Sequence, residues 1–308
     1  MSKNASPSYE QIFYLGGTGL SGIRDLSASY SVGQKVVRVL GAGFVRDVIA
    51  EPLQGEFSMT RDMLYQDPVL SLTGEAPISG TLLHGVQLDG AEQVYGFNTG
   101  YLTSYTVNCD VQDVPTIEST FAVFGQMGSG VREGELDYSG TAPVQNLGFV
   151  NHEAVFLTYN GSGTNRAVSV SQNYTINRTP IYTLDQKTDL TKYAPAEVLT
   201  EYPIEITTDF TIEVDDYEIA NMIDHIRSGI YETVGVEIRL GRKQDTLNDN
   251  NDECLKDNDG NCLGDDGDGI TRYEFLSTTG HLVSESIESS IDGVLRVNLQ
   301  FKDYYNKD

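Results

Sequence analysis

The feature that most constrains this chain is a repeat, because the second half carries the motifs of the first half in the same order. Residues 26–32 (LSASYSV) match residues 170–176 (VSQNYTI), and the shared tyrosines lie 144 positions apart (174 − 30). Both segments alternate apolar and polar residues, as half-buried β-strands do. Such a repeat over 308 residues predicts two copies of one architecture.

Later matches keep the same order with a slowly growing spacing. Residues 52–59 match residues 203–212, with a spacing of 151 at the proline (203 − 52) and 153 at the phenylalanine (210 − 57). Two further matches share a spacing of 180: Thr99–Ser104 with Thr279–Ser284, and Ile117–Phe121 with Val297–Phe301. The second copy therefore carries about 27 extra residues (180 − 153). The acidic stretch 245–269 has about that length, so we expect it to be an insertion between strands.

Periodicity indicates which elements build the two copies. Alternating apolar residues predict a strand over 295–301 and another over Val234–Leu240. One segment, Asp216–Ser228, has helical periodicity and is expected to pack on a sheet, with its apolar stripe formed by Ile219, Met222, Ile223 and Ile226. These patterns predict a mainly β chain with two domains, residues 1–150 and 151–308.

Charge limits the partners that the chain can bind. A net charge of −25 argues against binding nucleic acid by phosphate neutralisation, which needs clustered lysines and arginines. The acidity fits a surface that repels DNA, a salt-adapted protein, or a protein with many calcium ligands. The first residues lack the apolar stretch of a secretory signal, and no run is long enough to cross a bilayer. We therefore expect assembly in a cytoplasm and no membrane partner.

The acidic stretch is the candidate metal site. Its oxygen-bearing side chains suit a hard cation such as calcium, and the candidate ligands are Asp257, Asp259, Asn261, Asp265, Asp266, Asp268 and Glu274. Neither possible register completes a calcium-binding EF-hand loop, so a solvated acidic loop without an ion stays open as the alternative. Cys254 and Cys262 flank two of the candidate ligands and can form a disulfide in an oxidising medium. Cys109 lies on an alternating strand and is expected to be buried.

Catalytic signatures do not emerge from the sequence. The histidines are scattered and form no recognisable constellation with a nucleophile or a second base: they are His84, His152, His225 and His281. The glycine-rich segment 15–20 lacks the Lys-Ser/Thr ending of a phosphate-binding loop and precedes a strand. We therefore do not expect an enzyme.

Six segments of the first half resemble the tail tube proteins of long-tailed bacteriophages and related viruses. They are Leu26–Val32, Gly41–Phe44 together with Pro52–Ser58, Asp67–Gly74, Gly96–Val107 and Ile117–Phe124. The resemblance covers most of residues 10–125 and returns in weaker form over residues 153–308. The acidic insertion departs from the family pattern, because stacking of rings does not require it.

The resemblance implies a fold and a function. Each domain would be a tail-tube β-sandwich with a flanking helix, and the sheets of neighbouring subunits would join in a ring-shaped β-barrel. Because family rings contain six domains, three copies of a tandem chain would form a trimeric, pseudo-hexameric ring, and stacked rings would form the tail tube. DNA would pass through a negatively lined lumen without sequence-specific contact. Other partners would be the tape-measure, terminator and baseplate proteins of a virion tail assembled in the host cytoplasm.

Two other functions fit the same sequence. One is a calcium-dependent adhesion or carbohydrate-binding module of two β-sandwich domains, in which the acidic loop would be the working site. The other is a different ring of the tail, either a terminator or a baseplate ring. Stoichiometry distinguishes them, since a tube polymerises without limit whereas a terminator stops at one ring.

Overall fold

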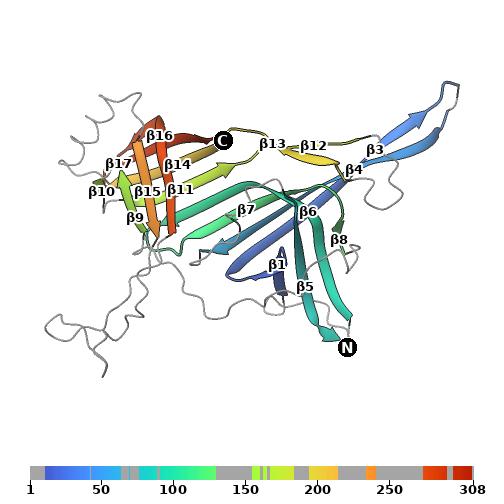
Figure 1. Ribbon diagram of the computed structural model, residues 1–308, viewed down its shortest axis with the longest axis horizontal. Helices are drawn as coiled ribbons and strands as arrows, with labels where there is room; N and C mark the ends of the chain where they lie inside the picture. Colours follow the sequence, from blue (N-terminus) through green and yellow to red (C-terminus); the bar gives the residue numbers. More distant parts are fainter. Residues whose placement is uncertain are drawn as a thin grey trace.

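The chain is mainly β. The computed structural model describes residues 11–41, 43–63, 69, 76–88, 91–129, 155–159, 162–164, 167–183, 194–213, 234–240, 273–289 and 294–306 (Figure 1). No α-helix occurs in this described part, and its strands include the predicted segment 234–240 and residues 296–301 of the predicted segment 295–301. The helix predicted at 216–228 and the acidic stretch 245–269 lie outside the described residues.

Seven strands of the first half, called the first strand set here, pair antiparallel. They are β1 (Gln11–Leu15), β2 (Thr18–Leu20), β3 (Ile23–Arg38), β4 (Val45–Asp62), β5 (Ile78–Leu88), β6 (Ala91–Asp110) and β7 (Thr116–Val123). Their order across the sheet is β2-β1-β5-β6-β7-β4-β3. A short strand, β8 (Met127–Gly128), adds to β6.

Seven strands of the second half form the second strand set. They are β9 (Val155–Tyr159), β10 (Ser162–Thr164), β11 (Ala167–Thr175), β14 (Ile204–Glu213), β15 (Val234–Leu240), β16 (Tyr273–Glu288) and β17 (Arg296–Tyr305). Their order is β10-β9-β15-β16-β17-β14-β11, which is the order of the first set with each strand replaced by its counterpart. Strands β12 (Arg178–Ile181) and β13 (Glu197–Thr200) make a separate ribbon.

The pairing registers of the two sets are also the same. Leu15 pairs with Thr18 in the first set and Tyr159 with Ser162 in the second, a spacing of 144 on both strands (159 − 15, 162 − 18). Leu102 pairs with Phe121, and the residues 180 positions later, Leu282 and Phe301, pair likewise (282 − 102, 301 − 121). Strand β5 maps onto β15 at a spacing of 156, because Ile78↔Gly100 becomes Val234↔Gly280 (234 − 78).

The irregularities repeat as well. The β6–β7 ladder shifts register between Leu102 and Ser104, and the β16–β17 ladder shifts between Leu282 and Ser284. The β5–β6 and β15–β16 ladders also shift at matching positions, between Ile78 and Gly80 and between Val234 and Val236. Bulges bend a strand and are positioned features of a sheet, so the two sets bend at the same places.

One sequence match is wrong by two residues. Phe57 pairs with Phe121, and the counterpart of Phe121 is Phe301, whose partner is Thr208. Strand β4 therefore maps onto β14 at 151 (208 − 57), the proline spacing, and the match of Phe57 with Phe210 at 153 fails. A shift of two residues keeps every side chain on its face of the sheet, which is why alternation alone did not reveal it.

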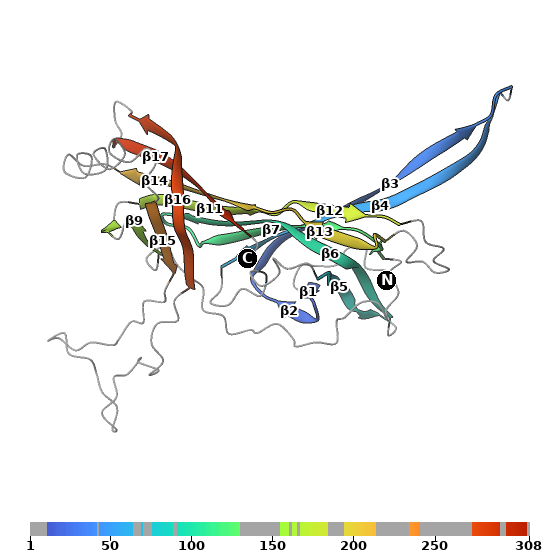
Figure 2. The ribbon, with the colours of Figure 1, turned by 45° about the horizontal axis from the view of Figure 1, so that its top comes forward.

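A layer of aromatic side chains fills the first set. Strands β1, β2 and β5 lie on one side of the sheet that contains β4 and β7 (Figure 2), and Phe13 stacks on Phe57 with ring centroids 4.9 Å apart. Phe97 joins them at 5.1 Å from Phe57. In the second set Phe210 stacks on Phe301 at 5.2 Å. All of these residues belong to one hydrophobic cluster, so the core continues across the domain boundary expected at residue 150.

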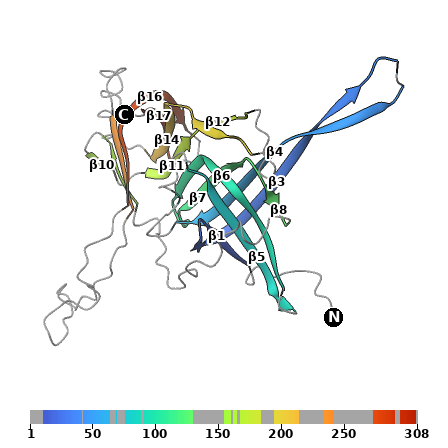
Figure 3. The same cartoon turned by 45° about the vertical axis from the view of Figure 1, so that its right-hand side comes forward.

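A long hairpin leaves the body of the molecule. The distal parts of β3 and β4 pair only with each other, from Gln34↔Ala50 to Arg38↔Val45, and project outward (Figures 1 and 3). The ribbon of β12 and β13 follows β11 as this hairpin follows the proximal part of β3. The first set thus continues its sheet into a hairpin, whereas the second set has a separate two-stranded ribbon at the corresponding place in the chain.

Candidate assembly surface: a polar face, an internal seam and two open edges

Eight strands form a central sheet in the order β3-β4-β7-β6-β11-β14-β17-β16. Alternation gives it two different faces: in β14 every second residue is buried, including Ile206, Phe210 and Ile212. The residues between them face the other way and are polar. We call this side the polar face, and its members on five neighbouring strands are Asn108, Asp110, Ser169, Ser171, Asp209, Thr211, Ser284, Ser286, Asn298 and Gln300.

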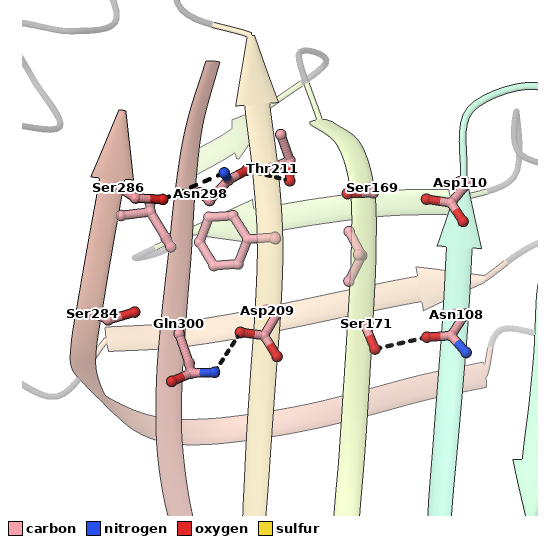
Figure 4. A pocket seen from close by; sticks show the side chains of 13 residues that line it. Asn108, Asp110, Ser169, Ser171, Asp209, Thr211, Ser284, Ser286, Asn298 and Gln300 are labelled. Atoms are coloured by element: carbon pink, nitrogen blue, oxygen red, sulfur yellow. Dashed lines mark hydrogen bonds between the residues drawn. The ribbon is translucent and has the colours of Figure 1, made fainter. Parts of the chain in front are cut away.

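Hydrogen bonds link the polar face from strand to strand across an open hollow (Figure 4). The Ser171 hydroxyl donates to Asn108 Oδ1 at 2.7 Å, and Gln300 Nε2 donates to Asp209 Oδ1 at 2.8 Å. The Thr211 hydroxyl donates to Asn298 Oδ1 at 2.7 Å. The side chains that line the hollow are mostly hydroxyls, amides and carboxylates, whereas small-molecule sites are mostly apolar. The arrangement suits a wet surface better than a ligand pocket.

The cations on this face of β17 are paired with carboxylates. Lys302 Nζ lies 2.6 Å from Glu205 Oε1, and Arg296 lies 3.2 Å from Glu213. The hydrogen bond from Lys302 lowers the pKa of Glu205, and the same bond raises the pKa of Lys302. Both pairs are accessible to water, so they neutralise positive charge on the surface while adding little stability.

The two strand sets meet where β6 pairs with β11, a contact that we call the internal seam. The register runs from Ser169↔Asp110 to Thr175↔Ser104. On the apolar side Tyr105 and Tyr174 meet edge to face. On the polar side Asn173 Oδ1 accepts hydrogen bonds from Ser104 at 3.2 Å and from Thr106 at 2.9 Å. The seam therefore combines a backbone ladder with contacts on both faces.

Burial shifts the ionisation of two groups at the seam. The pKa of Tyr174 is raised to about 12, first by desolvation and then by the charge of Asp303. The pKa of the Cys109 thiol is likewise raised to about 12, by desolvation and by Asp110. Cys109 is buried, as its place on an alternating strand predicted, and forms no disulfide with any residue in the described part of the chain. A thiol with so high a pKa stays protonated and unreactive at neutral pH.

Each end of the central sheet has an open edge. In the described residues β3 pairs with β4 alone, and the segment His281–Glu288 of β16 pairs only with β17. The two edges carry exposed apolar side chains, among them Tyr30 and Val32 on β3 and Val283 and Ile287 on β16. An unpaired edge is a template for another strand.

The residues proposed for calcium are not brought together by the described structure. Residues 257–268 and both cysteines of the proposed disulfide, Cys254 and Cys262, lie outside the described residues, and Glu274 is placed only by its backbone in β16. Within the described ranges there is no group of three or more His, Cys, Asp or Glu side chains that could hold a metal ion. The acidic stretch follows β15 and precedes β16, where the first set has the connection between β5 and β6.

Sequence reasoning did not identify the internal seam or the open edges. Pairing between strands distant in sequence leaves no local signature. The match of Tyr30 with Tyr174 could have revealed them. It shows that the edge strand β3 and the seam strand β11 are counterparts in the two halves of the chain.

No protein-family model and no curated protein matches this chain. None of the described residues belongs to a helix long and apolar enough to cross a membrane.

Proposed function

We propose that this chain is a tail tube subunit, a structural protein that joins copies of itself edge to edge into rings that stack. One observation carries the proposal: the two strand sets are joined through β6 and β11, while the counterparts of those strands, β16 and β3, keep open edges. The two edges differ from each other, so they would join head to tail. Such heterologous contacts close into a ring when the rotation between subunits permits it.

The repeated registers support a tandem duplication, and with it the number of chains in a ring. Each chain contributes two strand sets, so three chains supply six sets and a barrel of 24 strands (three times the eight of the central sheet). A trimer of this kind would have pseudo-sixfold symmetry. Closing the barrel also removes every open edge of the sheet.

The polar face supports a role as the lumen lining. Its side chains are hydroxyls, amides and carboxylates, and the cations of β17 are already paired with Glu205 and Glu213. DNA phosphates bind proteins by displacing counterions with lysines and arginines. A surface that offers few unpaired cations would let DNA slide past. Under this proposal the tape-measure, terminator and baseplate proteins of a virion tail are the other partners.

Calcium binding by the acidic stretch 245–269 is part of the same proposal. The carboxylates would repel one another without a cation, and a bound ion would offset that repulsion. The stretch connects β15 to β16 in the chain, so calcium binding there would act on assembly through the strand set to which both belong.

The test is negative-stain electron microscopy of the purified full chain over a range of concentrations, in millimolar calcium and after chelation. Hollow stacked rings are the expected result. A protein that remains monomeric in every condition overturns the proposal, and single rings that never stack contradict a tube and favour a terminator. Tubes that shorten on chelation support the role given to calcium, whereas tubes indifferent to chelation refute that role alone.

A further inference from the structure

The two open edges are the counterparts of the two strands that already pair inside the chain. Strand β3 maps onto β11 at a spacing of 144, because Ile23↔Arg61 in the β3–β4 ladder becomes Ala167↔Ile212 in the β11–β14 ladder (167 − 23). Strand β6 maps onto β16 at a spacing of 180. The internal seam therefore shows how a β3-like edge fits a β6-like edge.

Burial distinguishes the seam from the edges at matching positions. Val107 and Ile176 at the seam are 2 % and 1 % exposed, whereas their counterparts Ile287 and Val32 are 59 % and 45 % exposed. Tyr174 is half-buried, and its counterpart Tyr30 is 54 % exposed. Apolar side chains that are exposed in one strand set thus occupy positions that a paired strand covers in the other set.

We propose that β3 of one copy pairs antiparallel with β16 of a neighbouring copy in the register of the internal seam. The pair Tyr174↔Tyr105 translates into Tyr30 opposite Glu285 of the neighbouring copy (174 − 144, 105 + 180). The pairing then runs from Leu26 opposite Ser289 to Ser31 opposite Ser284. This inference rests on the proposed ring assembly and names the residues that form its contact.

Side chains on the polar side of the new seam would reproduce the bonds of the internal one. Asn173 accepts from Ser104 and Thr106, and the counterparts of all three are serines: Ser29, Ser284 and Ser286. Ser171 donates to Asn108, and the counterparts are Ser27 and Glu288, a hydroxyl opposite a carboxylate. Charge-assisted hydrogen bonds of that kind are stronger than neutral ones.

On the apolar side, the new pairing would cover side chains that are exposed in the single subunit. Ala28 would lie opposite Ile287 of the neighbouring copy, as Gln172 lies opposite Val107 at the internal seam. The short alanine leaves room for the larger isoleucine. One difference is that Glu285 replaces Tyr105, so a tyrosine faces a carboxylate where the internal seam has two tyrosines.

The backbone pattern selects residues for a crosslink. Ile176 N–H donates to Thr103 C=O and Val111 N–H donates to Val168 C=O, so hydrogen-bonded pairs alternate and Asn173↔Thr106 is a non-hydrogen-bonded pair. Such pairs have Cα atoms about 4.5 Å apart, within the range that a disulfide spans. The corresponding residues of the proposed seam are Ser29 and Ser286.

The test is oxidative crosslinking of the full chain with Cys254 and Cys262 replaced by serine. The variant Ser29→Cys/Ser286→Cys is expected to give covalent oligomers on non-reducing gels. A second in-register variant, Ser31→Cys/Ser284→Cys, covers the case in which the first does not fold. The matched control, Ser27→Cys/Ser284→Cys, places the thiols four residues out of register, about 13 Å along the strands, and is expected to stay uncrosslinked.

The outcomes separate this inference from the proposed function. Tubes in micrographs with crosslinks in both in-register variants, and none in the control, support the seam. Tubes without crosslinks in either in-register variant, or with crosslinks only in the control, overturn the register and leave the tube standing. A chain that forms neither tubes nor rings overturns the proposed function itself.

A substitution at the edge gives a second readout. Because Ile287 is exposed in the single subunit, Ile287→Lys is expected to leave the subunit's melting temperature unchanged while abolishing oligomers in sedimentation velocity. Ile287→Val, which keeps an apolar side chain, is expected to assemble as the parent does. Normal assembly of Ile287→Lys contradicts the seam.

Discussion

Tyr105 of β6 and Tyr174 of β11 meet edge to face, with ring centroids 6.1 Å apart and ring planes at 72°. The two rings come from different strand sets, so this contact joins the halves of the chain. Edge-to-face pairs are favourable beyond the area that they bury. Because one ring also has a raised pKa, the seam has a measurable pH dependence.

Tyr174 is expected to make stability fall at alkaline pH. Its pKa is about 12 in the folded chain against an ordinary value of 10.0 for tyrosine, so the unfolded chain loses this proton first. The contribution is complete below about pH 10 and is lost as the pH rises toward 12, with an amplitude of about 2 to 3 kcal/mol. The measurement is urea unfolding between pH 8 and pH 11.5 on the parent and on Tyr174→Phe. A stability difference between them that does not change with pH contradicts the prediction.

Gly80 and Gly100 are expected to tolerate no side chain. A Cβ added at either residue would meet the Phe97 ring at 2.4 Å, and neither glycine has a positive φ, so the cost is one of space alone. Gly80→Ala and Gly100→Ala are each expected to lower the free energy of unfolding by about 1 to 3 kcal/mol. The control is Gly43→Ala, because a Cβ at Gly43 meets nothing within 4 Å. Equal costs at all three positions in thermal unfolding would refute the packing argument.

Gln172 and Thr208 are expected to act as a coupled pair. Both are buried, and Gln172 Nε2 donates to Thr208 Oγ1 at 3.3 Å. Thr208→Val leaves the amide without this acceptor and is expected to cost about 1 to 3 kcal/mol. Thr211→Val on the water-accessible polar face is the control and should cost less. The double variant Gln172→Leu/Thr208→Val is expected to be more stable than the sum of the single effects predicts, and strict additivity in a double-mutant cycle would argue against coupling.

Lys302 and its neighbour Phe301 are expected to differ sharply in their effect on stability. Lys302→Met removes an exposed ion pair with Glu205 and should leave the free energy of unfolding nearly unchanged. Phe301→Ala removes a ring that is 1 % exposed and stacked on Phe210, at a cost of about 3 to 5 kcal/mol. Chemical denaturation of both variants checks this, and a large loss in Lys302→Met would show that the pair is more than a surface feature.

Local alternation was enough to predict strands at 26–32, 170–176, 234–240 and 295–301. The run from Leu295 to Phe301 places Val297, Leu299 and Phe301 in the core and leaves the residues between them outside it. The spacings of 144 and 180 also agree with the observed registers, because each rests on several matched residues within a strand, in two strands for the spacing of 180. The spacing of 153 at β14 failed because matching buried positions hold different residue types in the two sets. Thr208 is buried where the first set has Phe57.

The internal seam could not be predicted from the sequence, for a different reason. The sequence directed attention to the acidic stretch, where many carboxylates stand close together along the chain. The internal seam joins β6 to β11, strands separated by a long segment, and its residues are ordinary serines, threonines and tyrosines. What makes them a site is their position at the junction of the two strand sets, which only the topology supplies.

The internal seam also bears on how fast a ring could grow. In a ring of three chains, three of the six junctions are completed when each chain folds, and only three require an encounter between molecules. A covalent link replaces a bimolecular step by one at high effective concentration, so under the proposed assembly a chain with two strand sets would pass through fewer partly built intermediates than six separate units would. Under the same proposal the two kinds of junction could also differ in sequence, as Glu285 differs from its counterpart Tyr105.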